Sequence, residues 1–301
     1  MTSSSSTIAP MSINVGLETL SKPYKALFCD VWGVLIDGKR HFPRAVDALR
    51  RFRAQGGCVV LITNASRPDS DVRRQLTEMG LPSDCYDDLV SAGELTLAEM
   101  LSRRDQSCYH LGPSRDNGLF EEASQRLGAP IHCVGFNEAD YCVCTGLFEE
   151  RVEKPQDYDD LLTKMAARGL EMLCANPDII VAIGEEIVYC AGALAQRYAL
   201  LGGKVLMFGK PHPPIYAAAF ERLRRLRGQS IDPKDVLAIG DGAATDLAGA
   251  GRAGIDCLFI TEGVHEDELI TPDAEINPAG LARLINSAGA RPCALAGEVF
   301  W

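Results

Sequence analysis

Four apolar runs of the sequence are each followed closely by a polar side chain that could take part in chemistry. These side chains are Asp30, Thr63 with Asn64, Lys210, and Asp241. Two aspartates in one crevice repel each other unless a cation lies between them. Mg²⁺ prefers one or two carboxylates together with phosphate oxygens and water. A lysine and a threonine would hold the remaining phosphate oxygens, so these residue types predict metal-assisted phosphoryl chemistry.

One sheet must bring these side chains together, because they are far apart in the sequence. Short apolar runs alternate with amphipathic stretches, which is typical of βαβ units. The runs lie at 26–29, 58–62, 204–208, 236–239 and 257–260. We therefore predict an α/β fold with a doubly wound parallel sheet. The active crevice of such a sheet lies outside the carboxyl ends of its strands.

A second series of strands and helices interrupts this pattern in the middle of the chain. We interpret residues 87–197 as an inserted, smaller α/β cap domain that would set substrate specificity. The core domain is then discontinuous, formed by residues 20–86 and 198–301. Residues 1–19, which include a serine run, are expected to form a flexible tail.

Composition and charge exclude several classes of protein. The 301 residues are 47% hydrophobic and 24% charged, which are ordinary values for a globular protein. A formal net charge of −11 disfavours binding to nucleic acid or to an anionic membrane. The eleven cysteines include no CxxC pair, and no apolar stretch approaches twenty residues. We expect a cytoplasmic protein; the sequence leaves its oligomeric state open, a homodimer included.

Four short motifs, in order along the chain, resemble those of haloacid dehalogenase-type (HAD) hydrolases. They are Asp30-Val31-Trp32-Gly33-Val34, Leu61-Ile62-Thr63-Asn64, Gly209-Lys210-Pro211 and Gly240-Asp241-Gly242-Ala243-Ala244-Thr245-Asp246. The variants resemble class IIA, the NagD-like phosphatases, whose cap lies between the second and third motifs. The inserted block lies at the same place. The resemblance covers the chain from about residue 24 to residue 270.

The resemblance implies a Mg²⁺-dependent phosphatase that acts on a small phosphorylated metabolite, such as a sugar phosphate or a nucleotide. Asp30 would be the nucleophile that forms an aspartyl-phosphate. Asp30, the backbone carbonyl of Trp32, and Asp241 would ligate Mg²⁺.

The same resemblance implies how the phosphoryl group is held. Thr63 and the backbone N–H of Asn64 would cradle it, and Lys210 would offset its charge. Asp246 would orient Lys210 or a metal-bound water.

Three further residues are candidates for contacts with the substrate. Asn176 and Asp178 lie in an Asn-Pro-Asp segment that resembles part of the class IIA cap, although this is also a good turn sequence. Arg67 follows the second motif closely and would bind a second anionic group. An exposed arginine beginning a helix is the alternative.

The first motif departs from the family at Trp32, where HAD phosphatases carry a second aspartate that protonates the leaving oxygen. An indole N–H cannot perform this acid–base step, and losing such a group typically costs on the order of 10²–10⁴ in rate. Asp37 and His41 are loop residues that could substitute, but a solvated loop carboxylate and a surface histidine are favoured. Trp32 would either wall the substrate or fill the core.

Three interpretations follow from this departure. The first is a phosphatase with a substitute acid or a substrate with a good leaving group. The second is another HAD reaction, such as C–P or C–halogen cleavage. The third is a catalytically weak or silent scaffold that binds a phosphometabolite; the nucleophile Asp30 argues against it.

Overall fold

The computed structural model describes residues 12–183 and 186–301, and its largest element is a seven-stranded sheet. The strand order is β1-β13-β12-β11-β2-β3-β4, and every neighbouring pair is parallel. The strands are β1 (Ser12–Ile13), β2 (Ala26–Cys29), β3 (Cys58–Thr63), β4 (Asp88–Ser91), β11 (Val236–Gly240), β12 (Asp256–Ile260) and β13 (Ala294–Ala296). All their carboxyl ends therefore lie at one edge of the sheet.

Helices cover both faces of this sheet, because successive strand residues point to opposite sides. In β2, Leu27 and Cys29 join one buried apolar cluster, whereas Ala26 and Phe28 join another. Two of the longer helices contribute side chains to the first cluster, and three contribute to the second. They are α2 (Pro43–Ala54) and α3 (Asp69–Glu78), and then α8 (Pro213–Arg227), α9 (Ala248–Ala253) and α11 (Pro278–Ala288). The predicted doubly wound α/β class is confirmed.

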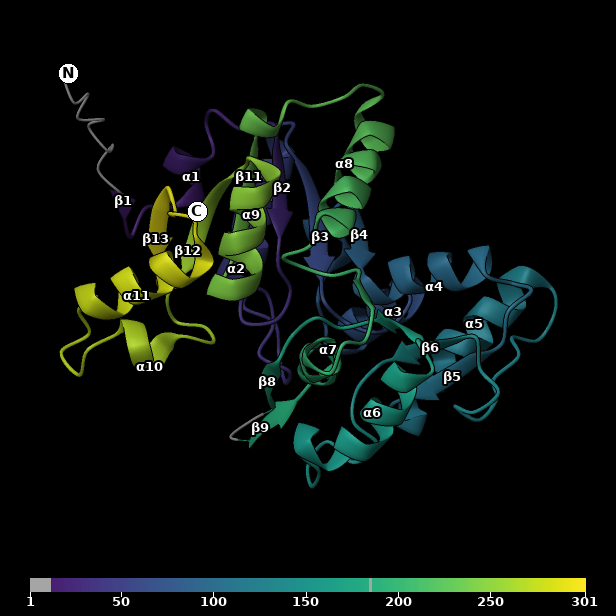
Figure 1. The fold of residues 1–301 in the computed structure, drawn as a ribbon. Helices are drawn as coiled ribbons and strands as arrows, with labels where there is room; N and C mark the ends of the chain where they lie inside the picture. The colour runs from purple at the N-terminus through teal and green to yellow at the C-terminus, as the bar shows by residue number, and fades with distance from the viewer. Residues whose placement is uncertain (1–11, 184–185) are drawn as a thin grey trace, which may run out of the picture.

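A smaller parallel sheet forms the second layered unit, at the lower right of Figure 1. Its order is β10-β7-β6-β5, with β5 (Cys108–Leu111), β6 (Tyr141–Cys144), β7 (Glu171–Cys174) and β10 (Val205–Met207). One face packs against α4 (Ala92–Ser102) and α5 (Gly118–Leu127), and the other against α6 (Asp159–Ala167) and α7 (Ala191–Leu200). An antiparallel hairpin, β8 (Ile180–Ile183) with β9 (Glu186–Tyr189), precedes α7.

Short elements complete the described chain. They are α1 (Leu17–Leu20), α10 (Glu266–Leu269), the 3₁₀ turns η1 (Ser83–Cys85), η2 (Ser114–Asn117), η3 (Pro155–Tyr158) and η4 (Pro233–Asp235), and the π-helical turn η5 (Ala243–Leu247). Within residues 12–183 and 186–301, no helix has the length and apolar character needed to cross a membrane.

Two strands belong to different sheets from those that the predicted domain boundaries imply. β4 lies inside the range 87–197 that we assigned to the cap, yet it pairs with β3 in the seven-stranded sheet. β10 lies inside the range 198–301 that we assigned to the core, yet it pairs with β7. The sequence of a short apolar run does not show which other strand it pairs with in the folded protein. The division into core and cap itself stays a prediction.

The predicted flexible tail, residues 1–19, is ordered where the structure describes it. The N–H of Asn14 donates to the carbonyl of Leu295, and that of Leu17 donates to Phe300. The side chain of Leu17 is fully buried. Burial of this leucine explains why the segment does not stay loose. The serine run lies outside the described residues.

Three neighbouring strands deliver most of the predicted chemistry to one place. β11, β2 and β3 are adjacent, with Ile239 in register with Cys29 and Cys29 in register with Leu61. Their last residues therefore bring Asp30, Thr63 and Asp241 to the same edge. Lys210 follows β10, which belongs to the smaller sheet. Our prediction that Lys210 follows a strand of the large sheet is therefore wrong.

Candidate active site

Three carboxylates converge at the carboxyl edge of the seven-stranded sheet. Asp30, Asp241 and Asp246 each offer an oxygen within 4.8 Å of the others, which is close enough to share one metal ion. All three side chains are buried. Asp30 stands immediately after β2, and its own N–H donates to the carbonyl of Ile239 over 2.8 Å. This bond ties the residue to β11, the strand that leads to Asp241.

Lys210 is the cation nearest to these carboxylates. Its Nζ lies 2.5 Å from Asp30 Oδ1 and 2.8 Å from Asp246 Oδ1. Burial alone would lower the pKa of Lys210, but the negative charges of Asp246 and Asp30 outweigh it and raise that pKa well above its usual value. The ammonium group is therefore held in its charged form between two acids.

One lysine does not balance the cluster. Three ionised carboxylates and one ammonium carry a net charge of −2. Burial raises the pKa of Asp30 well above its usual value, and the charge of Asp246 adds to this effect. Burial, followed by the charge of Asp246, also raises the pKa of Asp241 to about 7. A divalent cation would neutralise the cluster and return the carboxylates to their ionised form, so the donor set fits Mg²⁺.

Backbone groups of two loops pack closely against one oxygen of Asp241. The N–H of Val264 donates to Asp241 Oδ2 over 2.8 Å. A Cβ atom at Gly33 or at Gly263 would overlap Asp241 Oδ2. Gly33 also has a φ of +76°, which favours glycine. These two glycines let the loops after β2 and β12 close around the carboxylate.

A tight π-helical turn positions Asp246. The turn η5 follows β11 directly, and the N–H of Asp246 donates to the carbonyl of Gly242 over 2.8 Å. Asp246 Oδ2 accepts the N–H of Gly242 at 3.1 Å and the hydroxyl of Thr245 at 3.3 Å. Its other oxygen is thereby directed to Lys210. The turn η5 continues directly into α9.

Asn64 links three segments that meet around the predicted phosphoryl cradle. Its Oδ1 accepts the backbone N–H of Lys210 at 2.6 Å. Its Nδ2 donates to the carbonyl of Lys210 at 3.0 Å and to Asp178 Oδ1 at 2.8 Å. Thr63, the last residue of β3, is buried, and its Oγ1 accepts the N–H of Ala65 at 3.3 Å. The side chain of Asn64, whose backbone alone entered our prediction, thus fixes the backbone of Lys210.

The three candidate substrate residues have different surroundings. Asp178 contacts Asn64, and burial raises its pKa. Asn176 Oδ1 accepts the N–H of Asp178 at 3.0 Å, which is the turn that the alternative interpretation expected. Arg67 is half-buried, and its Nη1 donates to Gln75 Oε1 at 3.3 Å. Of the three side chains, that of Asp178 is therefore the one with a hydrogen bond to a residue of the predicted phosphoryl cradle.

The loop that follows Asp30 supplies no obvious substitute acid. Asp37 Oδ1 accepts the N–H groups of Lys39 and Arg40 at 2.8 and 2.9 Å, and these bonds lower its pKa. It is a turn residue that releases its proton readily. His41 lies beside Gly80, since a Cβ atom added to Gly80 would be 3.8 Å from His41 Nδ1.

Trp32 is 40% exposed, which does not fit a residue that fills the core. Its ring packs over Gly38, where an added Cβ would lie 2.8 Å from Trp32 Cζ3. An exposed indole two residues after Asp30 fits the interpretation of Trp32 as a hydrophobic wall.

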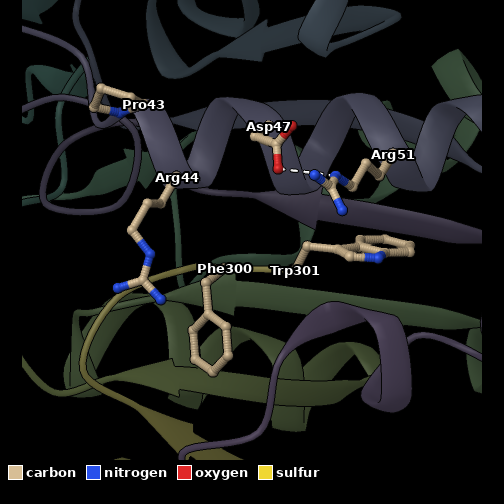
Figure 2. A pocket seen from close by; sticks show the side chains of 6 residues that line it. All are labelled: Pro43, Arg44, Asp47, Arg51, Phe300 and Trp301. Atoms are coloured by element: carbon tan, nitrogen blue, oxygen red, sulfur yellow. Dashed lines mark ion pairs between the residues drawn. The ribbon is translucent and has the colours of Figure 1, made fainter.

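A pocket of about 320 Å³ lies elsewhere, between α2 and the last residues of the chain (Figure 2). Its arginines are already neutralised. Arg44 pairs with Glu298, and Arg51 Nε lies 2.9 Å from Asp47 Oδ2. None of the predicted site residues lines it. We therefore assign the candidate active site to the carboxylate cluster and not to this pocket.

Sequence reasoning missed several contacts because backbone groups or distant segments make them. Val264 and Gly263 hold Asp241 through a backbone N–H and an absent side chain, so no residue type marks them. Asp116, in the turn η2 that precedes α5, accepts the hydroxyl of Ser66 at 3.4 Å. Gly263 and Val264 follow β12 at the same edge of the sheet, and this position is the signal from which they could have been predicted.

Comparisons with known proteins agree with this geometry. A haloacid dehalogenase-like hydrolase model matches residues 27–125, and a HAD-hydrolase-like model matches residues 207–287. The chain is 24% identical over 84% of its length to the 5′-nucleotidase YutF of Bacillus subtilis, covering 93% of that protein. It is 24% identical over 80% of its length to the ribonucleotide monophosphatase NagD of Escherichia coli K12, covering 88% of it.

A solved structure gives the stronger match. The crystal structure of a hydrolase of the haloacid dehalogenase-like family from Brucella suis 1330 is 37% identical, with a TM-score of 0.81. The match covers 96% of this chain and 99% of that one. At this identity and coverage, the chain belongs to the haloacid dehalogenase-like hydrolase family.

Proposed function

We propose that this hydrolase is a Mg²⁺-dependent phosphatase of class IIA that cleaves small phosphorylated metabolites through an aspartyl-phosphate on Asp30. The observation that carries the proposal is the position of Lys210 Nζ, 2.5 Å from Asp30 Oδ1 and 2.8 Å from Asp246 Oδ1, beside a third buried carboxylate. A nucleophilic carboxylate next to a fixed ammonium and an acidic metal site suits transfer of a dianionic phosphoryl group.

Asp30, Asp241 and the backbone carbonyl of Trp32 are the proposed ligands of Mg²⁺, which would offset the charge of the bound phosphate. Asp246 lies within ligand distance as well, but its Oδ1 already pairs with Lys210. Its proposed role is to hold Lys210 in place and to orient metal-bound water.

The remaining steps belong to the side chains of this chain. An oxygen of Asp30 attacks phosphorus, and the bond to the leaving oxygen breaks on the opposite side. Thr63, the N–H of Asn64, and Lys210 bind the phosphoryl oxygens during this transfer. Water then hydrolyses the aspartyl-phosphate and regenerates Asp30. Asn176, Asp178 and Arg67 are candidates for contacts with the rest of the substrate.

The proposed substrates are nucleotide-like molecules or sugar phosphates. YutF and NagD, which share 24% identity with this chain over most of its length, are both named for nucleotide hydrolysis. A screen of phosphorylated metabolites in the presence of Mg²⁺ would identify the preferred class.

Trp32 favours a second candidate, a weak or silent scaffold that binds a phosphometabolite. The indole provides no proton for the leaving oxygen. Substrates with good leaving groups need such a proton least, so they are the ones that the proposed phosphatase would cleave fastest. The two candidates predict different results with p-nitrophenyl phosphate, whose leaving group departs without protonation.

The test measures p-nitrophenyl phosphate hydrolysis with and without Mg²⁺ in the wild type and in Asp30→Asn. The proposal expects Mg²⁺-dependent turnover that falls at least about 10³-fold in the variant, because the nucleophile is lost. Asp105→Asn is the matched control, since the Asp105 side chain is 92% exposed.

Metal binding is measured separately by the shift of the melting temperature with Mg²⁺, which should be lost in Asp241→Asn. Wild-type protein that binds Mg²⁺ and hydrolyses nothing in the screen would support the binder. Turnover that persists in Asp30→Asn would contradict the proposed nucleophile.

A further inference from the structure

Two thiols lie side by side at the outer edge of the smaller sheet. Cys108 begins β5, the edge strand of that sheet, and Cys133 lies in the segment that runs beside it. Their Sγ atoms are 3.6 Å apart. This distance exceeds the length of an S–S bond, about 2.05 Å, by an amount that small side-chain rotations can close.

The backbone holds the two residues opposite each other. Cys108 and Cys133 form an isolated parallel bridge. The N–H of Cys108 donates to the carbonyl of His132 at 2.8 Å, and the N–H of Val134 donates to the carbonyl of Cys108 at 2.9 Å. Neighbouring strands lie about 4.7–4.9 Å apart, and this spacing falls within the range of Cα separations that a disulfide spans. The backbone pairing of the two segments therefore holds the two thiols close together.

The two thiols differ in access and in acidity. Cys133 is the exposed one among the eleven cysteines, nine of which are buried. The hydrogen bond with Cys108 lowers the pKa of the Cys133 thiol. The same bond, followed by burial, raises the pKa of Cys108. An exposed thiol that ionises more readily, next to a buried partner, is the arrangement of an attacking and a resolving cysteine.

We propose that Cys108 and Cys133 are a reversible disulfide site that reacts with low-molecular-weight disulfides. The Cys133 thiolate attacks one sulfur of the small disulfide, forming a mixed disulfide and releasing one small thiol. Cys108 then loses its proton and attacks the Cys133 sulfur, releasing the second small thiol. The protein loses two electrons and two protons, and the small disulfide gains them.

The disulfide would close a loop around one side of the smaller sheet. The residues between Cys108 and Cys133 form β5, η2 and α5, and they include Asp116, which accepts the hydroxyl of Ser66 from the loop after β3. Closing a loop of this length restricts the unfolded chain. The oxidised protein should therefore melt on the order of 5 °C higher than the reduced protein.

The experiment exposes the folded full-length protein to glutathione disulfide, alkylates the remaining thiols, and maps the products by mass spectrometry. We expect two of the eleven thiols to be lost, joined as Cys108–Cys133, and restored by reduced glutathione. Cys108→Ser should stop at a mixed disulfide on Cys133. Cys133→Ser, at an exposed position, should fold normally and form neither product.

Cys293→Ser is the matched control, since Cys293 is the half-buried thiol next in exposure to Cys133. It should form the same disulfide and show the same rise in melting temperature. The proposal is overturned if the wild type stops at the mixed disulfide, if another pair of cysteines is joined, or if Cys133 stays alkylatable throughout. None of these measurements depends on catalytic activity, so the result stands apart from the proposed phosphatase function.

Discussion

Two regions of this molecule combine basic side chains with carboxylates, but they balance these charges in different ways. In the pocket between α2 and the chain's last residues, Arg44 pairs with Glu298 and Arg51 pairs with Asp47, and all four side chains are at least 40% exposed. In the crevice, three buried carboxylates lie close together, and the ammonium of Lys210 pairs with two of them, Asp30 and Asp246.

The difference shows where chemistry is to be sought in a fold of this kind. Exposed one-to-one pairs are screened by water and contribute little. Buried carboxylates that outnumber the buried cations destabilise the fold unless a bound ligand neutralises the excess charge. The pocket beside α2 is therefore the less informative region, and the unbalanced cluster is the one suited to receive a cation and an anion.

The largest expected effect comes from removing the one cation of the crevice. Lys210→Met leaves Asp30 and Asp246 buried without a counter-charge, so we expect a loss of about 3 kcal/mol in the free energy of unfolding. Urea denaturation at neutral pH without Mg²⁺ measures it. In the pocket, Arg51→Met should cost less than about 1 kcal/mol. Equal losses in the two variants would remove the contrast between the regions.

Adding an acid to the crevice should have the next largest effect. Trp32→Asp introduces a carboxylic acid at the position where the motif resemblance places the general acid, so turnover of an alkyl phosphate ester should rise on the order of 10²-fold. The gain should be smaller with p-nitrophenyl phosphate, whose leaving group needs no proton. Trp32→Phe removes the indole without adding an acid, and Trp301→Asp adds an acid to the pocket; neither should raise turnover. A fall in turnover in Trp32→Asp would contradict our account of Trp32.

A third region tests whether burial of an acid, away from the crevice, is enough to couple stability to pH. Burial, followed by the charge of Glu94, raises the pKa of Asp69 to about 6. The folded protein therefore keeps a proton that the unfolded chain releases near pH 4. Stability should fall on the order of 2 kcal/mol as the pH rises from about 4 to about 6. Asp69→Asn should reduce this slope in urea denaturation and leave the part that the raised pKa of Asp241 contributes, whereas the exposed-site variant Asp105→Asn should keep the whole slope.

The smallest expected effect concerns the link between the crevice and the smaller sheet. Asp178→Ala removes the acceptor that holds Asn64 Nδ2, so kcat/KM for p-nitrophenyl phosphate should fall roughly tenfold. Asp178→Asn keeps an acceptor oxygen and should restore most of the activity. If Asp178→Asn lost as much as Asp178→Ala, the charge of Asp178 and not its hydrogen bond would matter.

The sequence predicted the fold class and the convergence of Asp30, Thr63 and Asp241 because both follow from local patterns. Apolar runs mark strands, and polar residues at the carboxyl ends of parallel strands share one edge. The sheet membership of β10 could not be predicted in this way. A short apolar run carries no record of which strand it pairs with, so Lys210 was assigned to the wrong sheet.

Backbone contacts were also beyond the reach of sequence patterns. The N–H of Val264 can bind Asp241 whatever side chain it carries, and Gly263 matters through the atoms it lacks. Leu17 looked like part of a loose tail because the segment around it is too short to show a clear periodicity, although its burial orders the segment.

The attachment of Lys210 to β10 has a mechanical consequence. Only Phe208 and Gly209 separate this lysine from the last residue of the smaller sheet. A Cβ at Gly209 would overlap Asn64 Oδ1 on one side and lie 2.6 Å from Pro177 Cδ on the other. A displacement of the smaller sheet relative to the larger one would therefore move Lys210 as well, and it would change the distance between the ammonium group and Asp30.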